Sequence, residues 1–114
     1  MPVNGYNPTI VQQIDSSFKV YKIDSITNFY LVYVTRATKR FKIISKKNPQ
    51  DCDAIDIGKY YYFDMIYMFG QIAGGVFKPT CVGVDNKTNI CLEDSITDLC
   101  FARNLKGLCI EGKK

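Results

Sequence analysis

The chain has 114 residues, the length of one ordinary domain and too short for two hydrophobic cores. Hydrophobic residues make up 46% of it and charged residues 23%, which is a globular composition, and a net charge of +4 indicates no particular partner. It contains no histidine. This excludes the catalytic centres and zinc sites that depend on imidazole, so we expect a protein that is not an enzyme and has no metal or cofactor.

The first sixteen residues are rich in turn formers, among them Asn4, Gly5, Asn7 and Pro8. We interpret residues 1–16 as an N-terminal arm that precedes a single β-barrel domain at residues 17–111. The arm has neither a basic leader nor a long apolar stretch, so the sequence predicts no signal peptide and no transmembrane segment. It fits either a cytoplasmic protein or a mature chain from which a leader was removed.

Strand-forming residues alternate with polar ones from position 18 to position 69, with short turns between the runs. This pattern predicts a curled antiparallel sheet that begins as a three-stranded meander. We place the first three strands at residues 18–26, 28–36 and 40–45. The second is apolar on both faces, which is typical of a central strand that is covered on both sides.

On the first strand, strict alternation predicts that Phe18 and Val20 share one face and that Tyr21 and Ile23 share the other. Later strands are expected at residues 59–69, 81–84, 90–92 and 107–110.

One segment near the C-terminus has helical spacing. Ile96, Leu99 and Cys100 recur at intervals of three and four residues, which predicts a short helix over residues 94–102. The predicted fold is therefore mostly β: a small, OB-like, partly open antiparallel barrel with one short C-terminal helix.

Five cysteines are present, and no two of them form a Cys-x-x-Cys pair. This argues against a zinc knuckle and a thioredoxin-like redox pair. An exported protein would form one or two disulfides and keep a free thiol. The other interpretation, which we favour, is that most are small buried residues, because Cys91, Cys100 and Cys109 have apolar neighbours.

Basic residues and tyrosines gather around the second predicted hairpin. These candidate binding residues are Tyr30, Tyr33, Arg36, Lys39, Arg40 and Lys42. Single-stranded nucleic acid is bound by cations that meet phosphates and rings that stack on bases. That hypothesis requires the four cations on one face together with Tyr30 or Tyr33. The competing interpretation, a solvated hairpin whose lysines protect an edge, is the one we favour.

A second candidate is the tyrosine run at positions 60 to 62. Tyr60 and Tyr62 could form a stacking platform for a sugar or a peptide. Alternation favours a simpler arrangement, in which Tyr61 and Phe63 enter the core while Tyr60 and Tyr62 cover the outer face.

Three stretches of the chain carry a family resemblance. They are NFYLVYVTRATKRFKIISKK at residues 28–47, IDIGKYYYFDM at 55–65 and NICLEDSITDLCFARNLKGLCI at 89–110. Together they resemble small exported proteins and lipoproteins of gut Bacteroidales. The resemblance implies an exported or envelope-associated protein and no enzyme activity, and it gives no catalytic residue to carry over.

The sequence therefore predicts a non-catalytic binding or structural module of the bacterial cell envelope, either periplasmic or secreted, with an unknown protein or small ligand as partner. A cytoplasmic location is the alternative. Two other functions stay open: a single-stranded nucleic-acid-binding protein, and an inhibitor or immunity-type protein with an exposed apolar patch around residues 70–77.

Overall fold

The computed structural model describes residues 17–48, 52–68, 81–93 and 95–111, and all regular structure in these ranges is β. The strands are β1 (Ser17–Ile26), β2 (Phe29–Arg36), β3 (Lys39–Lys46), β4 (Tyr60–Tyr62), β5 (Met65–Tyr67), β6 (Cys81–Gly83), β7 (Asn89–Cys91), β8 (Asp98–Ala102), β9 (Leu105–Lys106) and β10 (Cys109–Ile110). The described residues form no helix that is long and apolar enough to cross a membrane. The expected N-terminal arm lies outside these ranges.

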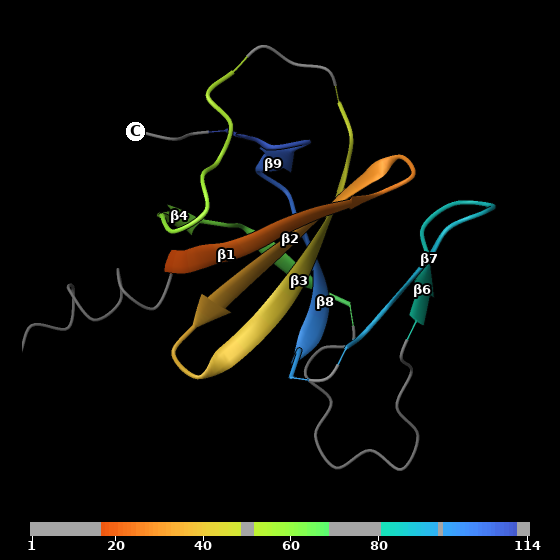
Figure 1. Cartoon of the computed structure of the whole chain (residues 1–114), viewed down its shortest axis with the longest axis horizontal. Helices are drawn as coiled ribbons and strands as arrows, with labels where there is room; N and C mark the ends of the chain where they lie inside the picture. Colours follow the sequence, from red (N-terminus) through yellow and green to blue (C-terminus); the bar gives the residue numbers. More distant parts are fainter. Residues whose placement is uncertain (1–16, 49–51, 69–80, 94, 112–114) are drawn as a thin grey trace, which may run out of the picture.

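Six strands form the main sheet, in the order β4-β1-β2-β3-β8-β5. The two edge strands, β4 and β5, are separated in the chain only by Phe63 and Asp64. A link of that length spans at most about 11 Å, so the sheet has to curl until its edges approach each other. The predicted β fold is confirmed in this form: a strongly curled half-barrel (Figure 1).

The predicted meander is confirmed. β1 pairs with β2, and β2 with β3, both antiparallel. Each connection is a two-residue turn whose first residue has a positive φ, 48° at Thr27 and 56° at Ala37. Turns that begin in this way match the right-handed twist of paired strands, so they favour tight hairpins.

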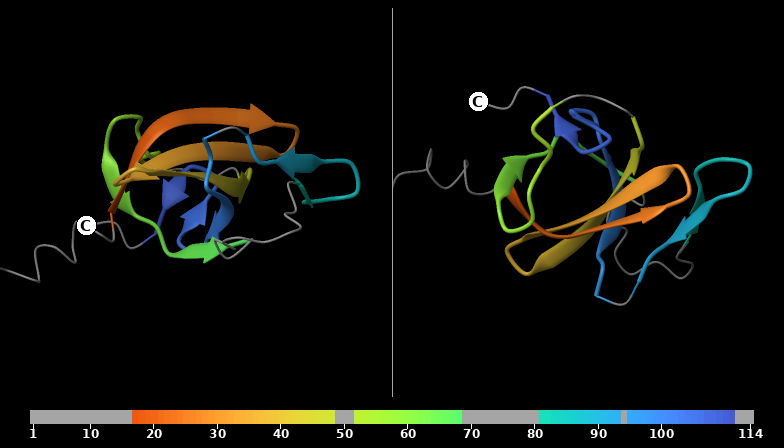
Figure 2. Two further views of the ribbon diagram at one scale, coloured as in Figure 1. Left: turned by 90° about the horizontal axis from the view of Figure 1, so that it is seen from below. Right: turned by 45° about the horizontal axis from the view of Figure 1, so that its top comes forward.

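The sheet buries apolar side chains on both faces, as expected for a central β2. The inner cluster consists of Phe18, Val20, Val32, Val34, Phe41, Ile43, Ile55, Phe63, Cys100 and Leu105. The outer cluster consists of Phe29, Leu31, Tyr33, Ile44, Ile90, Ile96 and Leu99. Figure 2 shows the sheet curled around the β9–β10 hairpin, while the β6–β7 hairpin lies outside the curl.

The alternation predicted for the first strand is confirmed as far as Tyr21, which packs against the outer cluster, and is wrong beyond it. The pairing of β1 with β2 shifts by one residue between Val20 and Lys22, which is a β-bulge at Tyr21. Because side chains alternate along a strand, the shift brings Ile23 to the inner cluster with Phe18 and Val20. Bulges also increase the local twist, which suits a sheet that must curl.

The long fourth strand predicted at residues 59–69 is also wrong, since it is divided into β4 and β5. At the break, Asp64 is bound to another part of the chain. Its N–H donates to Asn104 Oδ1 at 2.9 Å, and its carbonyl accepts from the Arg103 N–H at 2.9 Å. These bonds turn the chain away from β1 and carry it toward β8.

The predicted helix over residues 94–102 is wrong, because Asp98–Ala102 form strand β8. β8 lies between β3 and β5, parallel to β3 and antiparallel to β5, so the sheet is mixed and the prediction of a wholly antiparallel barrel is wrong. Asp98, Leu99 and Cys100 are all fully buried, since both faces of this strand are covered. A strand buried on both faces loses its alternation, which is why the apolar spacing resembled that of a helix.

The final strand predicted at residues 107–110 is confirmed only in its second half, as β10, which forms a small hairpin with β9 around Gly107. Gly107 has a φ of +58°, and a Cβ there would lie 3.2 Å from the Asn48 carbonyl oxygen. Its own carbonyl accepts a buried hydrogen bond of 2.8 Å from Ser45 Oγ. The hairpin is therefore fixed closely against the end of β3.

Four of the five cysteines form disulfides, Cys52–Cys109 and Cys81–Cys91, so the favoured interpretation of mostly buried thiols is wrong. Cys81 and Cys91 face each other across the β6–β7 pair, a relation that the sequence did not reveal. Cys100 alone is a buried free thiol. Two disulfides point to an oxidising environment.

Candidate functional site

Three large apolar or aromatic side chains are exposed on and before β4. Ile57 is 59% exposed, Tyr60 66% and Tyr62 57%. We call these three residues the tyrosine edge. Tyr60 and Tyr62 point outward as predicted, while Phe63 is buried and Tyr61 packs against the inner cluster. Exposed aromatic rings that gather at one place are a common mark of a binding surface.

Side-chain bonds hold the end of β4 in place. Asn104 Nδ2 donates to the Tyr62 carbonyl at 2.8 Å, and Arg103 Nη1 forms an ion pair of 3.0 Å with Asp64. On the neighbouring strand, Lys19 pairs with Tyr60 in register, and its Nζ lies 6.0 Å from the centre of that ring. The two rings are therefore presented from a fixed strand and not from a loop.

A hollow of about 610 Å³ opens beside Tyr60. Asp53, Asp56 and Lys59 supply its charged groups, and Cys52, which is disulfide-bonded to Cys109, forms part of its wall. Lys59 Nζ lies 3.5 Å from Asp56 Oδ2, and both side chains are well exposed. The hollow thus offers hydrogen-bond donors and acceptors next to an aromatic ring.

The basic residues predicted around the β2–β3 hairpin do not share one face. Register pairs Arg36 with Lys39 and Thr35 with Arg40, and paired residues lie on the same side of a sheet. The Arg36 guanidinium lies 4.7 Å from the centre of the inner Phe18 ring. The Arg40 guanidinium lies 5.7 Å from the ring of Tyr21, on the outer side. The arrangement required for binding single-stranded nucleic acid is therefore not formed.

The two predicted tyrosines of this region are also separated. Tyr30 packs against the inner cluster, with Lys47 Nζ 5.2 Å from its ring, while Tyr33 is buried in the outer cluster. Neither ring is presented on a surface together with the four cations.

Lys42 is buried, and it forms a structural anchor with two other residues. Its Nζ donates to Glu93 Oε2 at 2.6 Å and to the Cys91 carbonyl at 2.9 Å, and Tyr33 Oη donates to the same Glu93 oxygen at 2.5 Å. The hydrogen bond from Lys42, followed by that from Tyr33, lowers the pKa of Glu93. Burial, followed by the bond to Glu93, raises the pKa of Tyr33. We call Tyr33, Lys42 and Glu93 the outer anchor, because they fasten the end of β7 to the sheet.

Sequence reasoning missed Glu93 and Asn104, which lie 51 and 42 residues from Lys42 and Tyr62, the residues that they bind. No local pattern joins such distant positions. Among the described residues, no three Cys, Asp or Glu side chains come together in a way that could hold a metal ion. The apolar patch expected around residues 70–77 lies outside the described ranges.

No protein-family model, no curated protein and no solved structure matches this chain.

Proposed function

We propose that the protein is a non-catalytic binding module of the bacterial cell envelope, and that it contacts its ligand through the tyrosine edge. The observation that carries the proposal is the exposure of Tyr60 and Tyr62, 66% and 57%, on a strand whose other side packs on the core. Side chains of this size are seldom left together in water without a use in binding.

The disulfides support an envelope location. Cys52–Cys109 and Cys81–Cys91 would not persist in a reducing cytoplasm. The resemblance to exported Bacteroidales proteins, carried by the segments at residues 28–47, 55–65 and 89–110, agrees with this location.

The OB-like character of the barrel belongs to the same proposal. A meander of β1, β2 and β3, a closing strand β8 and the divided strand β4 and β5 are consistent with a five-stranded, partly open barrel. OB folds bind ligands on the face of the second and third strands. In this chain Ile90 and Ile96 cover that face, so the ligand needs another surface. The tyrosine edge is exposed and meets this need.

The ligand class that fits the tyrosine edge best is a saccharide. Sugar rings have flat apolar faces that can stack on Tyr60 and Tyr62. Their hydroxyl groups can donate hydrogen bonds to the carboxylates of Asp53 and Asp56 and accept them from the Lys59 ammonium group in the adjoining hollow. A ligand held by stacking and hydrogen bonds also needs no catalytic histidine.

The test is a glycan array that is probed with three proteins: wild type, the double variant Y60S/Y62S and the control I66S. Ile66, 40% exposed, lies on the opposite edge strand β5, so I66S removes exposed apolar surface elsewhere. We expect wild type and I66S to bind the same glycans and Y60S/Y62S to lose at least tenfold in signal. If wild type binds no glycan, or if all three proteins bind equally, the proposal is wrong.

A further inference from the structure

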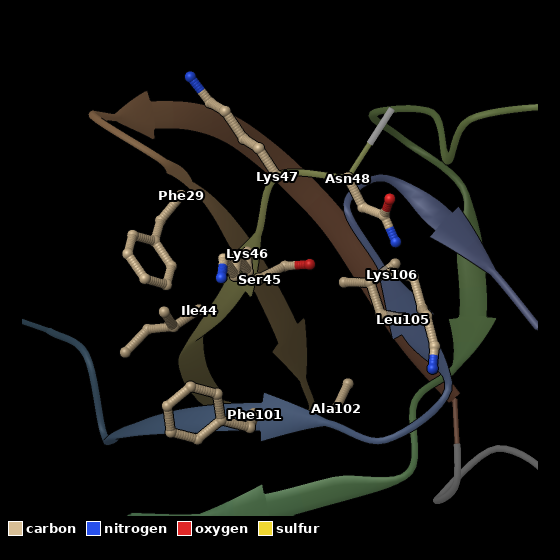
Figure 3. A pocket seen from close by; sticks show the side chains of 10 residues that line it. All are labelled: Phe29, Ile44, Ser45, Lys46, Lys47, Asn48, Phe101, Ala102, Leu105 and Lys106. Carbon is tan, nitrogen blue, oxygen red and sulfur yellow. The ribbon is translucent and has the colours of Figure 1, made fainter. Parts of the chain in front are cut away.

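A second hollow lies at the C-terminal end of β3. Unlike the hollow beside Tyr60, it is lined by lysines and apolar side chains. Its volume is about 460 Å³, and it is formed where β2, β3, β8 and β9 meet. Figure 3 shows Phe29, Ile44 and Phe101 along one side and Asn48, Leu105 and Lys106 along the other. We call it the lysine hollow.

The apolar side of the lysine hollow is fixed. Phe29 and Ile44 are 6% and 2% exposed and belong to the outer cluster, against which Phe101 packs. The opposite side is fixed by the contact of Gly107 with Asn48 and by the buried bond from Ser45 to Gly107. The hollow is therefore preformed, which is typical of small-molecule sites.

The charged side chains that line this hollow all carry a positive charge. Lys46, Lys47 and Lys106 line it, and none of its lining residues is an aspartate or a glutamate. Lys106 has an ion pair of 3.5 Å with Glu111, but both side chains are about half exposed, so this pair is weak. Lys46 and Lys47 form no ion pair within the described part of the chain. Lys47 extends away from the hollow in Figure 3, which leaves Lys46 and Lys106 as the cations beside it.

We propose that the lysine hollow binds a single-chain amphiphilic carboxylate, such as a fatty acid of short or medium length. The hydrocarbon chain would lie against the partly exposed Phe101 and Ala102, beside the buried Phe29 and Ile44, because burial of exposed apolar surface favours binding there. The carboxylate would meet Lys46 and Lys106, whose ammonium groups form charge-assisted hydrogen bonds with it. At about 460 Å³ the hollow is near the lower end of the range for ligand sites, which suits one short chain and not a two-chain lipid.

Binding of octanoate, measured by calorimetry and by amide chemical shifts, tests this inference. Octanol and octylammonium have the same chain length without the negative charge. The test variant is K46Q/K106Q, and the control is K22Q/K39Q, which removes the same charge from two exposed lysines that do not line the hollow. All four lysines are exposed, so we expect every variant to fold.

We expect octanoate to bind wild type saturably and to shift the amide signals of Asn48, Phe101 and Ala102. K46Q/K106Q should bind it at least tenfold more weakly, K22Q/K39Q should match wild type, and octylammonium should bind at least tenfold more weakly than octanoate. The inference is overturned if wild type shows no saturable octanoate binding or if octylammonium binds equally well. Equal weakening in both double variants would also overturn it, since only net charge would then matter.

Discussion

The two faces of the sheet are held together in different ways. The inner cluster is composed of apolar side chains and the Cys100 thiol, and the Cys52–Cys109 disulfide ties the chain that covers it. Next to Tyr33 of the outer cluster lies the buried Lys42, whose charge is balanced by Glu93. The hairpin that carries Cys81–Cys91 covers this cluster. Apolar contacts respond little to pH, whereas a buried ion pair depends on the protonation of its partners. The Lys42–Glu93 pair therefore makes the outer face sensitive to pH. The inner side is not purely apolar either, because Asp98, two residues before Cys100, is fully buried.

Removal of a disulfide should give the largest loss in the free energy of unfolding, and the size of the loss should differ between the two faces. The Cys52–Cys109 bond has a sequence separation of 57 residues and Cys81–Cys91 one of 10. Loop entropy then predicts losses of about 4 kcal/mol for C52S/C109S and about 3 kcal/mol for C81S/C91S. Urea unfolding of both double variants measures the difference. An equal or reversed order would mean that the inner disulfide is not the stronger constraint.

Loss of Glu93 and loss of Lys42 from the outer anchor should lower the free energy of unfolding by different amounts. In E93Q, Lys42 stays buried without its counter-charge, and we expect the free energy of unfolding to fall by about 2 kcal/mol. This is less than for a fully buried pair, because Glu93 is 47% exposed. In K42M the remaining glutamate can be hydrated, so the loss should stay below about 1 kcal/mol.

The double variant K42M/E93Q, which contains neither charge, is the matched control. It should recover most of the stability that E93Q loses. If K42M costs more than E93Q, then the buried cation is not the group that needs its partner.

A smaller effect is expected from acid. The pKa of Glu93 is lower in the folded protein than in the unfolded chain, chiefly through the bond from Lys42. The ion pair therefore contributes its full stability above the unfolded pKa, near 4.5, and loses it as the pH falls through the lower folded value. Urea midpoints between pH 7 and pH 3 should fall less steeply for E93Q than for wild type.

D85N is the control for this pH dependence. The pKa of Asp85 is also lowered, first by a hydrogen bond from the Lys87 backbone, but Asp85 is fully exposed and belongs to the hairpin turn. If D85N reduced the fall of the urea midpoint with acid more than E93Q does, the outer anchor would not be the main source of this pH dependence.

Part of this fold follows from local sequence, and the difference between the faces explains which part. The meander from Ser17 to Lys46 is local, so alternation and short turns predict it. β8 is not local: it pairs with β3 across more than fifty residues, and burial on both faces removed the alternation that marks a strand. The residue types do not reveal the bulge at Tyr21. With or without a bulge, the first strand has apolar residues on both faces, so the pattern does not distinguish the two registers.

The candidate sites divide in the same way. Tyr60 and Tyr62 could be predicted to point outward, because alternation on a single strand is enough. The basic cluster could not be placed, because neighbours in sequence, such as Arg36 and Arg40, lie on opposite faces of a hairpin. The lysine hollow combines Lys46 with Lys106 and Phe101, residues that only the parallel pairing of β8 with β3 brings together.

The most direct test of the two disulfides and of the proposed envelope location is a thiol count on the chain purified from its natural source. Burial, followed by the charge of Asp98, raises the pKa of the Cys100 thiol, so it should not react in the native protein. We predict no reactive thiol in the native protein, one after denaturation without reductant, and five after denaturation with reductant, with the single label on Cys100. Five thiols without reductant would contradict both the disulfides and the oxidising location.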